Sequence, residues 1–557
     1  MVVLETKFSE LKKFVGKNLT EKQLEELLFN IGFELEDISD DDIKIEITAE
    51  RPDLLSTQGL ARAVRSYLGL KNKNYEVKKS NENIDVVVEA NEWPYVVACV
   101  VKNLKFDDEK IKEVIRIQEK LGSTYLRNRK KGGLGIYPLE GIKFPVKYTS
   151  EEPSKIIFRP LEFDNELNGY EILEKHPTGR IYKNIIEKWK KFPIFVDNEG
   201  KIMSMPPIIN SHNLGKIDEN TVNVFVEATG NDFKTINIAF NVLVGALMDM
   251  GGEVYTLNIN YKKNKILAPD FSEEKRTIEL KKINSVLGTE MKSEDVKKFL
   301  EKMMYEVKSF DENNLRIVVP STRSDIWHDI DIIDDVARAY GFNNFEPRIK
   351  NVESFGSTTK SVKIKEEIST LLVGMGYQEV FTLILTNTND QFDRMNLKET
   401  ECIKLERSAE AGINMARSWL TPELIKVLHS NRSVEYPHKI FEVNYVINPD
   451  KESDVKSKDT LKLSVITSHS TANFTEIKQI LDALAKALGL EYEIEELNHP
   501  SFISGRSGKI NINKKEIAII GEIHPQVLKN WGLEMPVATL EIELNSIFNL
   551  NSGNNGL

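Results

Sequence analysis

The stretch LRIVVPSTRSDIWHDIDIIDDVARAYGF (315–342) decides the fold, because the chain carries it twice. The other copy, IKIEITAERPDLLSTQGLARAVRSYLGL (43–70), aligns with it without gaps at an offset of 272 residues, and the match reaches back to Leu19. Both copies share an Arg-x-Asp loop and a glycine, Gly69 or Gly341, that stops the last helix. These shared features favour duplication over a chance match, so the sequence predicts two copies of one small α/β module.

Length, charge and cysteine content restrict the class of protein. The 557 residues are enough for roughly three to five domains. With 75 Lys and Arg against 86 Asp and Glu, the net charge of −11 repels polyanions, so nucleic-acid binding would need a local basic surface or a partner. Two cysteines cannot build a disulfide framework, and no apolar run approaches the roughly 18 residues of a membrane span. We expect a cytoplasmic protein that is not exported.

The pattern along the chain predicts an α+β multidomain fold. The two modules are expected at 1–85 and 266–350, on either side of an α+β domain at 86–265. A polar linker leads into a further region of strands and helices at 351–550. The Gly- and Asn-rich tail, 551–557, is expected to be disordered.

An acidic cluster marks the second module but not the first. Within eleven residues stand five carboxylates, and the last three are spaced i, i+3, i+4 on one face of a helix start. Oxygen ligands without His or Cys favour Mg²⁺ before Ca²⁺. The alternative is that these side chains are solvated, stabilised by about 0.3–1 kcal/mol through the helix dipole, or face a basic partner. The cluster consists of Asp325, Asp329, Asp331, Asp334 and Asp335.

Two apolar stretches of the middle domain, MPPIINSHN (205–213) and VFVEATG (224–230), end in polar residues. Strand alternation places Glu227 and Thr229 on one face, so both can address one ligand. The alternative is that strand ends are ordinarily polar. Five side chains are candidates for lining one pocket: Ser211, His212, Asn213, Glu227 and Thr229.

A basic run, RNRKK (127–131), lies near Tyr125 and Tyr137 in the sequence, and further lysines follow in EKWKK (187–191). Clustered cations beside aromatic rings suit the end of a single-stranded nucleic acid, through phosphate neutralisation and base stacking. A solvated charged face is the alternative.

Taken together, these motifs resemble the β subunit of phenylalanyl-tRNA synthetase in its shorter archaeal and eukaryotic form. The resemblance also rests on ARSWLTPELIKVL (416–428) and KIFEVNYV (439–446), and it follows the family's order over nearly the whole chain. It implies that the two modules are the B1 and B5 domains and that 86–265 is a B3/B4-like editing domain. It further implies that 351–550 is a class II synthetase-like core that has lost its catalytic arginines. The segment GEIHPQVLKNWGL (521–533) lacks the GxGxER pattern of an ATP-binding third motif.

The resemblance implies the partners as well. The chain would support ATP-dependent attachment of phenylalanine to tRNA(Phe) in an (αβ)₂ heterotetramer, with ATP bound mainly by the α subunit. Its middle domain would hydrolyse tyrosine wrongly esterified to that tRNA, with Glu227 accepting the tyrosyl hydroxyl and with Ser211 and Thr229 orienting the ester or a water. The alternative is a tRNA-binding scaffold without hydrolysis. The implied Mg²⁺ contacts, at a site shared with the α subunit, are Asp325, Asp331, Asp334 and Asp335.

Overall fold

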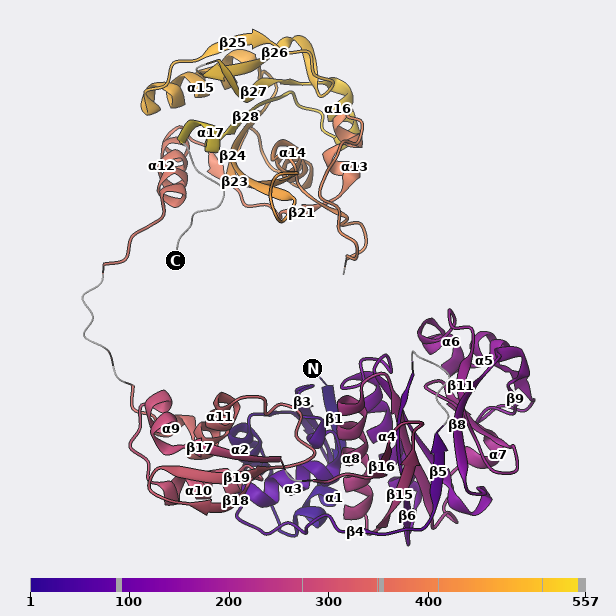
Figure 1. Cartoon of the computed structure of the whole chain (residues 1–557). Helices are drawn as coiled ribbons and strands as arrows, with labels where there is room; N and C mark the ends of the chain where they lie inside the picture. Colours follow the sequence, from indigo (N-terminus) through magenta and orange to yellow (C-terminus); the bar gives the residue numbers. More distant parts are fainter. Residues whose placement is uncertain are drawn as a thin grey trace. The chain divides into compact units, whose positions relative to one another are not determined.

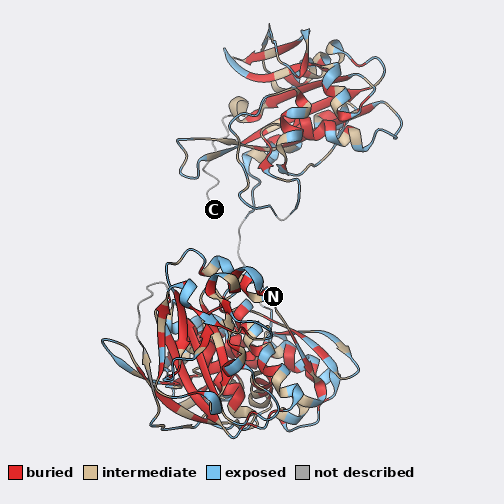
Figure 2. Ribbon diagram, turned by 90° about the vertical axis from the view of Figure 1, so that its right-hand side faces the viewer, coloured by how far each residue is buried: buried red, intermediate tan, exposed pale blue. Residues whose placement is uncertain are grey.

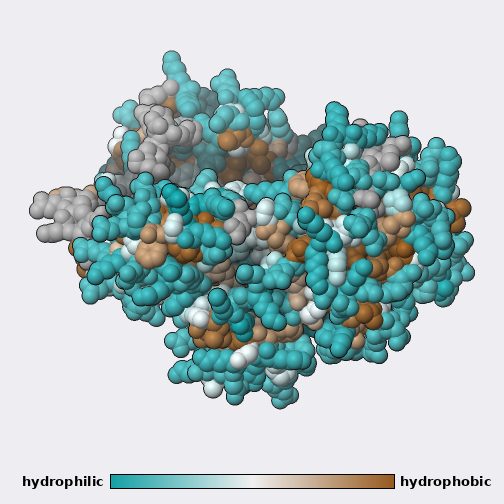
Figure 3. Space-filling view, turned by 60° about the horizontal axis from the view of Figure 1, so that its bottom comes forward, coloured by the Kyte–Doolittle hydropathy of each residue, from teal (hydrophilic) through white to brown (hydrophobic). Residues whose placement is uncertain are grey.

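The structure is a computed structural model that divides into two compact units, residues 1–349 and 350–557 (Figure 1). The predicted tail lies outside the described residues. Within the described part, no helix is long and apolar enough to cross a membrane. Hydrophilic side chains cover most of the face drawn in Figure 3, and apolar ones gather there in separate patches. The structure describes residues 2–86, 93–272, 274–347, 349, 355–408, 410–512 and 514–548.

The first module packs three helices on a three-stranded sheet of order β1-β3-β2. Thr20 starts its second helix with a capping box to Gln23, and Gly16 and Gly32 end the first two helices in the left-handed conformation. The apolar face of that second helix, from Leu24 to Ile31, is buried. The elements are β1 (Val2–Lys7), α1 (Phe8–Val15), α2 (Glu21–Ile31), β2 (Glu34–Ser39), β3 (Asp42–Ile47) and α3 (Thr57–Tyr67).

The second module repeats the first element by element, and each element starts 272 residues after its counterpart. Strand order, register and even the bulge in the second strand recur. The predicted duplication is therefore confirmed, and it extends to the first strand and helix, which the sequence match did not reach. The elements are β17 (Glu274–Glu279), α9 (Leu280–Leu287), α10 (Ser293–Lys302), β18 (Glu306–Phe310), β19 (Asn314–Val319) and α11 (Asp329–Tyr340).

Between the modules lies an 11-stranded sheet whose main path runs β13-β12-β11-β8-β5-β15-β6-β14-β7. Its strands at 77–78, 83–86 and 265–268 pair with β15, so this sheet crosses both predicted domain borders, at 85 and 265. The strands are β4 (Val77–Lys78), β5 (Asn83–Val86), β6 (Tyr95–Lys102), β7 (Gly132–Pro138), β8 (Val146–Glu151), β11 (Phe192–Val196), β12 (Ile202–Met205), β13 (Ile209–Asn210), β14 (Val224–Gly230), β15 (Glu253–Asn260) and β16 (Lys265–Ala268).

Helix α8 (Phe233–Asp249) packs against β14, β6 and β7 on one face of this sheet, and the residues between them are buried. Figure 2 shows that much of this unit's ribbon is buried. The helix is apolar nearly all round, as expected for an element enclosed by protein. The opposite face of β14 is covered by the far end of the same sheet, because a hydrogen bond joins Tyr137 of β7 to Ser204 of β12. The sheet therefore curls back on itself. Further helices are α4 (Asp108–Ser123), α6 (Pro177–Tyr182) and α7 (His212–Gly215).

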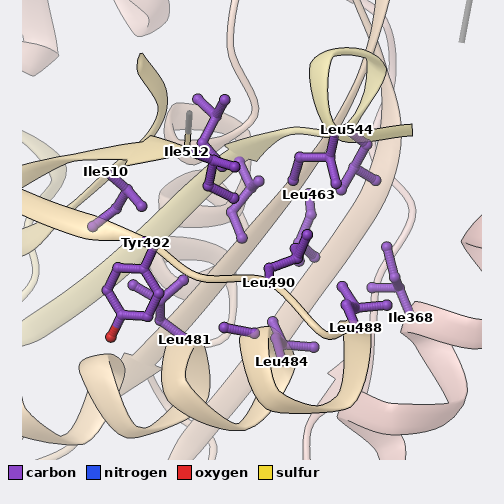
Figure 4. A pocket seen from close by; sticks show the side chains of 14 residues that line it. Ile368, Leu463, Leu481, Leu484, Leu488, Leu490, Tyr492, Ile510, Ile512 and Leu544 are labelled. Atoms are coloured by element: carbon purple, nitrogen blue, oxygen red, sulfur yellow. The ribbon is translucent and has the colours of Figure 1, made fainter. Parts of the chain in front are cut away.

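The second unit is built on a seven-stranded sheet of order β20-β23-β24-β28-β27-β26-β25, antiparallel except between β20 and β23. A cavity of about 20 Å³, lined by Leu, Ile, Ala and one Tyr, lies between α15 and the sheet (Figure 4). It is a packing gap without polar partners for a water. The elements are α12 (Lys360–Gly374), β20 (Gln378–Glu379), α14 (Thr421–Ser430), β23 (His438–Pro449), β24 (Ser457–Ser468), α15 (Phe474–Leu488), β25 (Glu493–Glu496), β26 (Phe502–Ile512), β27 (Lys515–Ile523), α16 (Pro525–Trp531) and β28 (Val537–Glu543).

Candidate functional site

Glu227 and Thr229 lie on one face of β14, as strand alternation predicted, and both are buried. In the register of the sheet Glu227 pairs with Ala98 on β6 and with Gly135 on β7, and Thr229 pairs with Gly133. A Cβ atom on Gly135 would stand 2.3 Å from Oε1 of Glu227. The glycines of β7 are therefore needed to leave space beside these two polar side chains.

The carboxyl of Glu227 is held from one side only. The hydroxyl of Tyr137 lies 3.1 Å from Oε1 of Glu227 and 2.8 Å from Oγ of Ser204. Burial raises the pKa of Glu227 to about 8, against the opposing effect of the Tyr137 hydrogen bond. At neutral pH this side chain is therefore mainly an uncharged carboxylic acid, which both donates and accepts hydrogen bonds.

Two polar atoms of this face have no hydrogen-bond partner among the described residues: Oε2 of Glu227 and Oγ1 of Thr229. Leaving a buried polar atom unpaired costs about 1–3 kcal/mol, and native structures contain few such atoms. These two lie two residues apart on one strand face, and one polar ligand bound there would satisfy both.

Ser211 lies next to the face of β14 that carries Glu227 and Thr229, but its hydroxyl caps a helix. Its backbone N–H donates to the carbonyl of Met203 at 2.8 Å, which places it beside Ser204. Its Oγ accepts the N–H of Leu214 at 3.3 Å and so caps α7. Of the other candidates, His212 has a buried Nδ1 with no partner in the described part of the chain, and Asn213 is exposed.

Sequence reasoning named Tyr137 only beside the basic run, and it placed neither Tyr137 nor Ser204 next to Glu227. In the structure Tyr137 follows Gly135, the partner of Glu227, by two residues and so shares the face of Glu227, but the sequence does not reveal this register. Nothing in the sequence pointed to Ser204, since its contact depends on the curl of the sheet.

The carboxylates of the acidic cluster form hydrogen bonds and ion pairs with other residues of this chain. Arg323 donates to both oxygens of Asp325, at 2.7 and 2.6 Å, and to Oδ2 of Asp335 at 2.9 Å. The hydroxyl of Tyr305 donates to the same oxygen of Asp335 at 2.7 Å. Burial opposes ionisation of Asp325, but the hydrogen bond and charge of Arg323 hold its pKa below the usual value.

The remaining acids of the cluster point to other partners. Oδ2 of Asp331 accepts the N–H groups of Trp327 and His328 at the start of α11, at 2.7 and 2.6 Å. Asp334 pairs with Arg338 at 2.8 Å, and Asp329 pairs with Lys282 at 2.6 Å.

These contacts do not fit a metal centre built by this chain alone. In the part of the chain that the structure describes, no three His, Cys, Asp or Glu side chains form a group that could hold an ion. The two most buried aspartates of the cluster, Asp325 and Asp335, face the guanidinium of Arg323, which already supplies a positive charge.

The basic run differs from its predicted form. Arg129 turns inward, donates to two backbone carbonyls at 207–208 and packs over the ring of Tyr182 at 4.3 Å. The expectation that Tyr137 stacks on a base is wrong, because its ring is fully buried under Glu227. Tyr125 is half-buried, and burial raises the pKa of its hydroxyl to about 12.

In the second unit, Arg417 of the motif ARSWLTPELIKVL is fully buried. Its guanidinium lies 3.1 Å from Oε1 of Glu442 and 2.6 Å from the hydroxyl of Thr382. An arginine held in this way cannot reach a nucleotide at the surface.

Three family models match the chain. The Phe-tRNA synthetase beta subunit B1 domain matches residues 1–70, the tRNA synthetase B5 domain matches 276–342, and the phenylalanyl tRNA synthetase beta chain CLM domain matches 347–544. The two matched small domains coincide with the duplicated modules.

Similar proteins and one similar structure agree with these matches. The phenylalanine–tRNA ligase beta subunits of Thermococcus sibiricus and Pyrococcus abyssi are 39% and 38% identical to this chain, over 97% of it and 98% of their own length. A crystal structure of an N-terminal fragment of the phenylalanyl-tRNA synthetase β-subunit from Pyrococcus horikoshii is 34% identical, with a TM-score of 0.59, and covers 61% of this chain and 100% of the fragment.

Proposed function

Because this chain belongs to the family of phenylalanine–tRNA ligase β subunits and is thus a subunit of an aminoacyl-tRNA synthetase, we propose that its central domain is the ligase's editing site. This site hydrolyses tyrosine that has been wrongly esterified to tRNA(Phe). The observation that carries the proposal is the pair of buried, unpartnered oxygens, Oε2 of Glu227 and Oγ1 of Thr229, beside the glycines of β7.

The need for such a site follows from the chemistry of the two amino acids. A pocket shaped for an apolar ring rejects an added hydroxyl by only about 10²-fold, whereas a pocket that hydrogen-bonds the hydroxyl rejects the analogue lacking it by about 10⁴–10⁵. The uncharged carboxyl of Glu227 suits this second task, since it can accept from a phenol without burying a charge.

Glu227 and Thr229 have different roles because they lie at different positions along β14. Glu227, held by Tyr137, binds the tyrosyl hydroxyl. Thr229, one pleat nearer the strand end, orients the ester or the attacking water. Ser211 secures the loop beside them as the cap of α7, and no side chain of the site is assigned as a nucleophile.

The test uses the ligase assembled with its α subunit and supplied with tyrosine, ATP and tRNA(Phe). We expect Glu227→Ala to accumulate Tyr-tRNA(Phe) that the wild type does not, while both charge phenylalanine at the same rate. Equal, low Tyr-tRNA(Phe) levels in the two proteins would instead favour the alternative, a tRNA-binding scaffold without hydrolysis. One observation favours that alternative: the hydroxyl of Ser211, a predicted editing residue, already caps α7.

For the rest of the assembly we propose that the 351–550 region is a class II-like core that serves as a scaffold for the α subunit in an (αβ)₂ enzyme. ATP is then bound by the α subunit, since Arg417 is buried and no GxGxER pattern is present in 521–533. The predicted Mg²⁺ contact at Asp325, Asp331, Asp334 and Asp335 requires further oxygen ligands from that partner, because this chain alone does not gather the four carboxylates.

A further inference from the structure

The two modules pack against each other through equivalent helices. Helix α11 of the second module packs against α2 of the first, and α10 of the second packs against α3 of the first. Because α10 is the counterpart of α2 and α11 is the counterpart of α3, exchanging the modules turns one of these contacts into the other. This is the arrangement of a symmetric dimer, in which a patch meets its own copy, formed here within one chain.

The Arg-x-Asp loops of the two modules also meet at this interface. The hydroxyl of Ser324 in the second loop donates to the backbone carbonyl of Glu50, which begins the first loop, at 2.8 Å. Burial opposes ionisation of Asp325, yet its pKa is lowered by Arg323 and also by the charge of Arg51 from the first loop. In a symmetric dimer the segment nearest the two-fold axis contacts its own counterpart, as these loops do.

In the contact between α2 and α11, a large side chain lies over a glycine. Nη1 of Arg338 on α11 donates to the carbonyl of Ile31, the last residue of α2, at 3.1 Å. Gly32 follows with a φ of +99°, and a Cβ atom there would stand 1.7 Å from the same Nη1. A side chain at position 32 would therefore displace the guanidinium from Ile31, so this contact requires a small residue after α2.

In the contact between α10 and α3, the sizes are reversed. The counterpart of Gly32 is Met304, which has a φ of 70° although it is not glycine. Its side chain packs against the hydrophobic cluster that includes the core of the first module. The counterpart of Arg338 is Ser66, and Ser66 and Met304 both line a cavity of about 930 Å³. Here the large residue follows α10 and the small one lies on α3.

A neighbouring pair of positions also differs between the two contacts. Nζ of Lys302 on α10 lies 5.1 Å from the ring centroid of Tyr67 at the end of α3, a favourable cation–π distance. The counterparts of these residues are Asn30 and Ala339, which offer neither a cation nor a ring. Lys302 therefore finds its aromatic partner on the first module and would face alanine on a second copy of its own module.

We propose that these differences make each module fit the other and not a second copy of itself. Two second modules would set Met304 against Arg338 in both contacts, and two first modules would set Gly32 against Ser66 and leave both contacts underfilled. The proposed (αβ)₂ assembly holds two copies of each module. The four residues then act as specificity determinants that keep the pairing within one chain.

The test imitates each wrong pairing inside the full chain, assembled with its α subunit. Gly32→Met with Ser66→Arg gives both contacts the residues of two second modules. Arg338→Ser with Met304→Gly gives them the residues of two first modules. We expect hydrogen-exchange protection of α2 and α11 to fall at least tenfold in the first variant and at least threefold in the second, since an overlap is less tolerated than a gap. Wild-type protection in both variants would overturn the proposal.

Combining all four substitutions separates pairing specificity from a merely structural role. The fourfold variant has Met and Ser in the contact between α2 and α11, and Gly and Arg in the other contact, so a large residue again meets a small one on each side. We expect its protection to return to within threefold of wild type. Protection as low as in the Gly32→Met with Ser66→Arg variant would overturn the proposal.

The matched control for backbone strain is Gly288→Met. Gly288 ends α9 with a φ of +67°, and no described atom lies within 4 Å of a Cβ atom placed there. This variant should lose less protection in α9 than Gly32→Met alone loses in α2, because only the latter also displaces Arg338. Equal losses would assign the effect at Gly32 to strain and contradict the proposed contact.

Discussion

Two buried carboxyls of this chain, Asp335 and Glu227, each accept a hydrogen bond from a tyrosine hydroxyl, yet their surroundings differ in one respect. Asp335 also faces the guanidinium of Arg323, whereas among the described residues Glu227 has no cation beside it and keeps one oxygen without a partner. Nη1 of Arg323 likewise lacks a partner there, but the carboxyl of Asp335 has its counter-charge within the chain. Glu227 has none, and this is why we place the chemistry at Glu227.

The first module shows that the arginine contact belongs to the fold. There Arg51 binds Asp53 as Arg323 binds Asp325, and each guanidinium lies over an aromatic ring, at 5.9 and 5.8 Å. The second module then adds two groups together: Tyr305 replaces Phe33 and Asp335 replaces Ala63. The added acid and the added hydroxyl satisfy one another, so the duplicated fold accommodates them without a new backbone.

The largest effect should come from removing the shared cation. Arg323→Met removes the cation that Asp325 and Asp335 share, and breaking a buried ion pair by removing one partner costs about 3–5 kcal/mol. We expect this loss in the free energy of opening of α11, measured by hydrogen exchange. The matched change Arg51→Met breaks the one ion pair to Asp53 and removes only a longer-range attraction for Asp325, so it should cost less. An equal loss at Arg51 would show that Asp335 does not depend on Arg323.

The carboxyl of Glu227 should behave in the opposite way. Its pKa is raised to about 8, so between pH 4.5 and 8 the folded chain holds a proton that the unfolded chain releases. Wild-type stability of the central domain, relative to Glu227→Gln, should therefore fall by about 1.4 kcal/mol for each pH unit across this range. Denaturant titrations of both proteins at pH 5 and pH 8 check this, and a pH-independent difference would mean that Glu227 is ionised.

The smallest effect concerns the two added groups. Asp335→Ala and Tyr305→Phe should each cost about 1–3 kcal/mol, because each leaves a buried polar partner unpaired. The double variant restores the residues of the first module, so it should lose less than the sum, with a coupling of about 1 kcal/mol. Hydrogen exchange of α11 in the four proteins measures the cycle. Additive losses would contradict the pairing.

Local patterns predicted the features that depend on near neighbours. The repeat, the shared face of Glu227 and Thr229, and the crowding of acids at the start of α11 follow from spacing alone. The direction of each acid does not. Asp334 and Asp335 are adjacent, yet one pairs with Arg338 outside and the other with Arg323 inside. Inside, Asp335 also accepts from Tyr305, thirty residues earlier, a contact that spacing along the helix does not reveal.

Contacts that require the three-dimensional path of the sheet were beyond sequence reasoning. Tyr137 and Ser204 meet only because β7 and β12 approach as the sheet curls.

The most direct measurement is the single-turnover hydrolysis of preformed Tyr-tRNA(Phe) by the assembled ligase, compared between Glu227→Ala and Asp335→Ala. We predict that Glu227→Ala reduces hydrolysis to the uncatalysed rate while Asp335→Ala, once shown to be folded, retains the wild-type rate. Wild-type hydrolysis by Glu227→Ala would contradict the assignment of the editing site to β14.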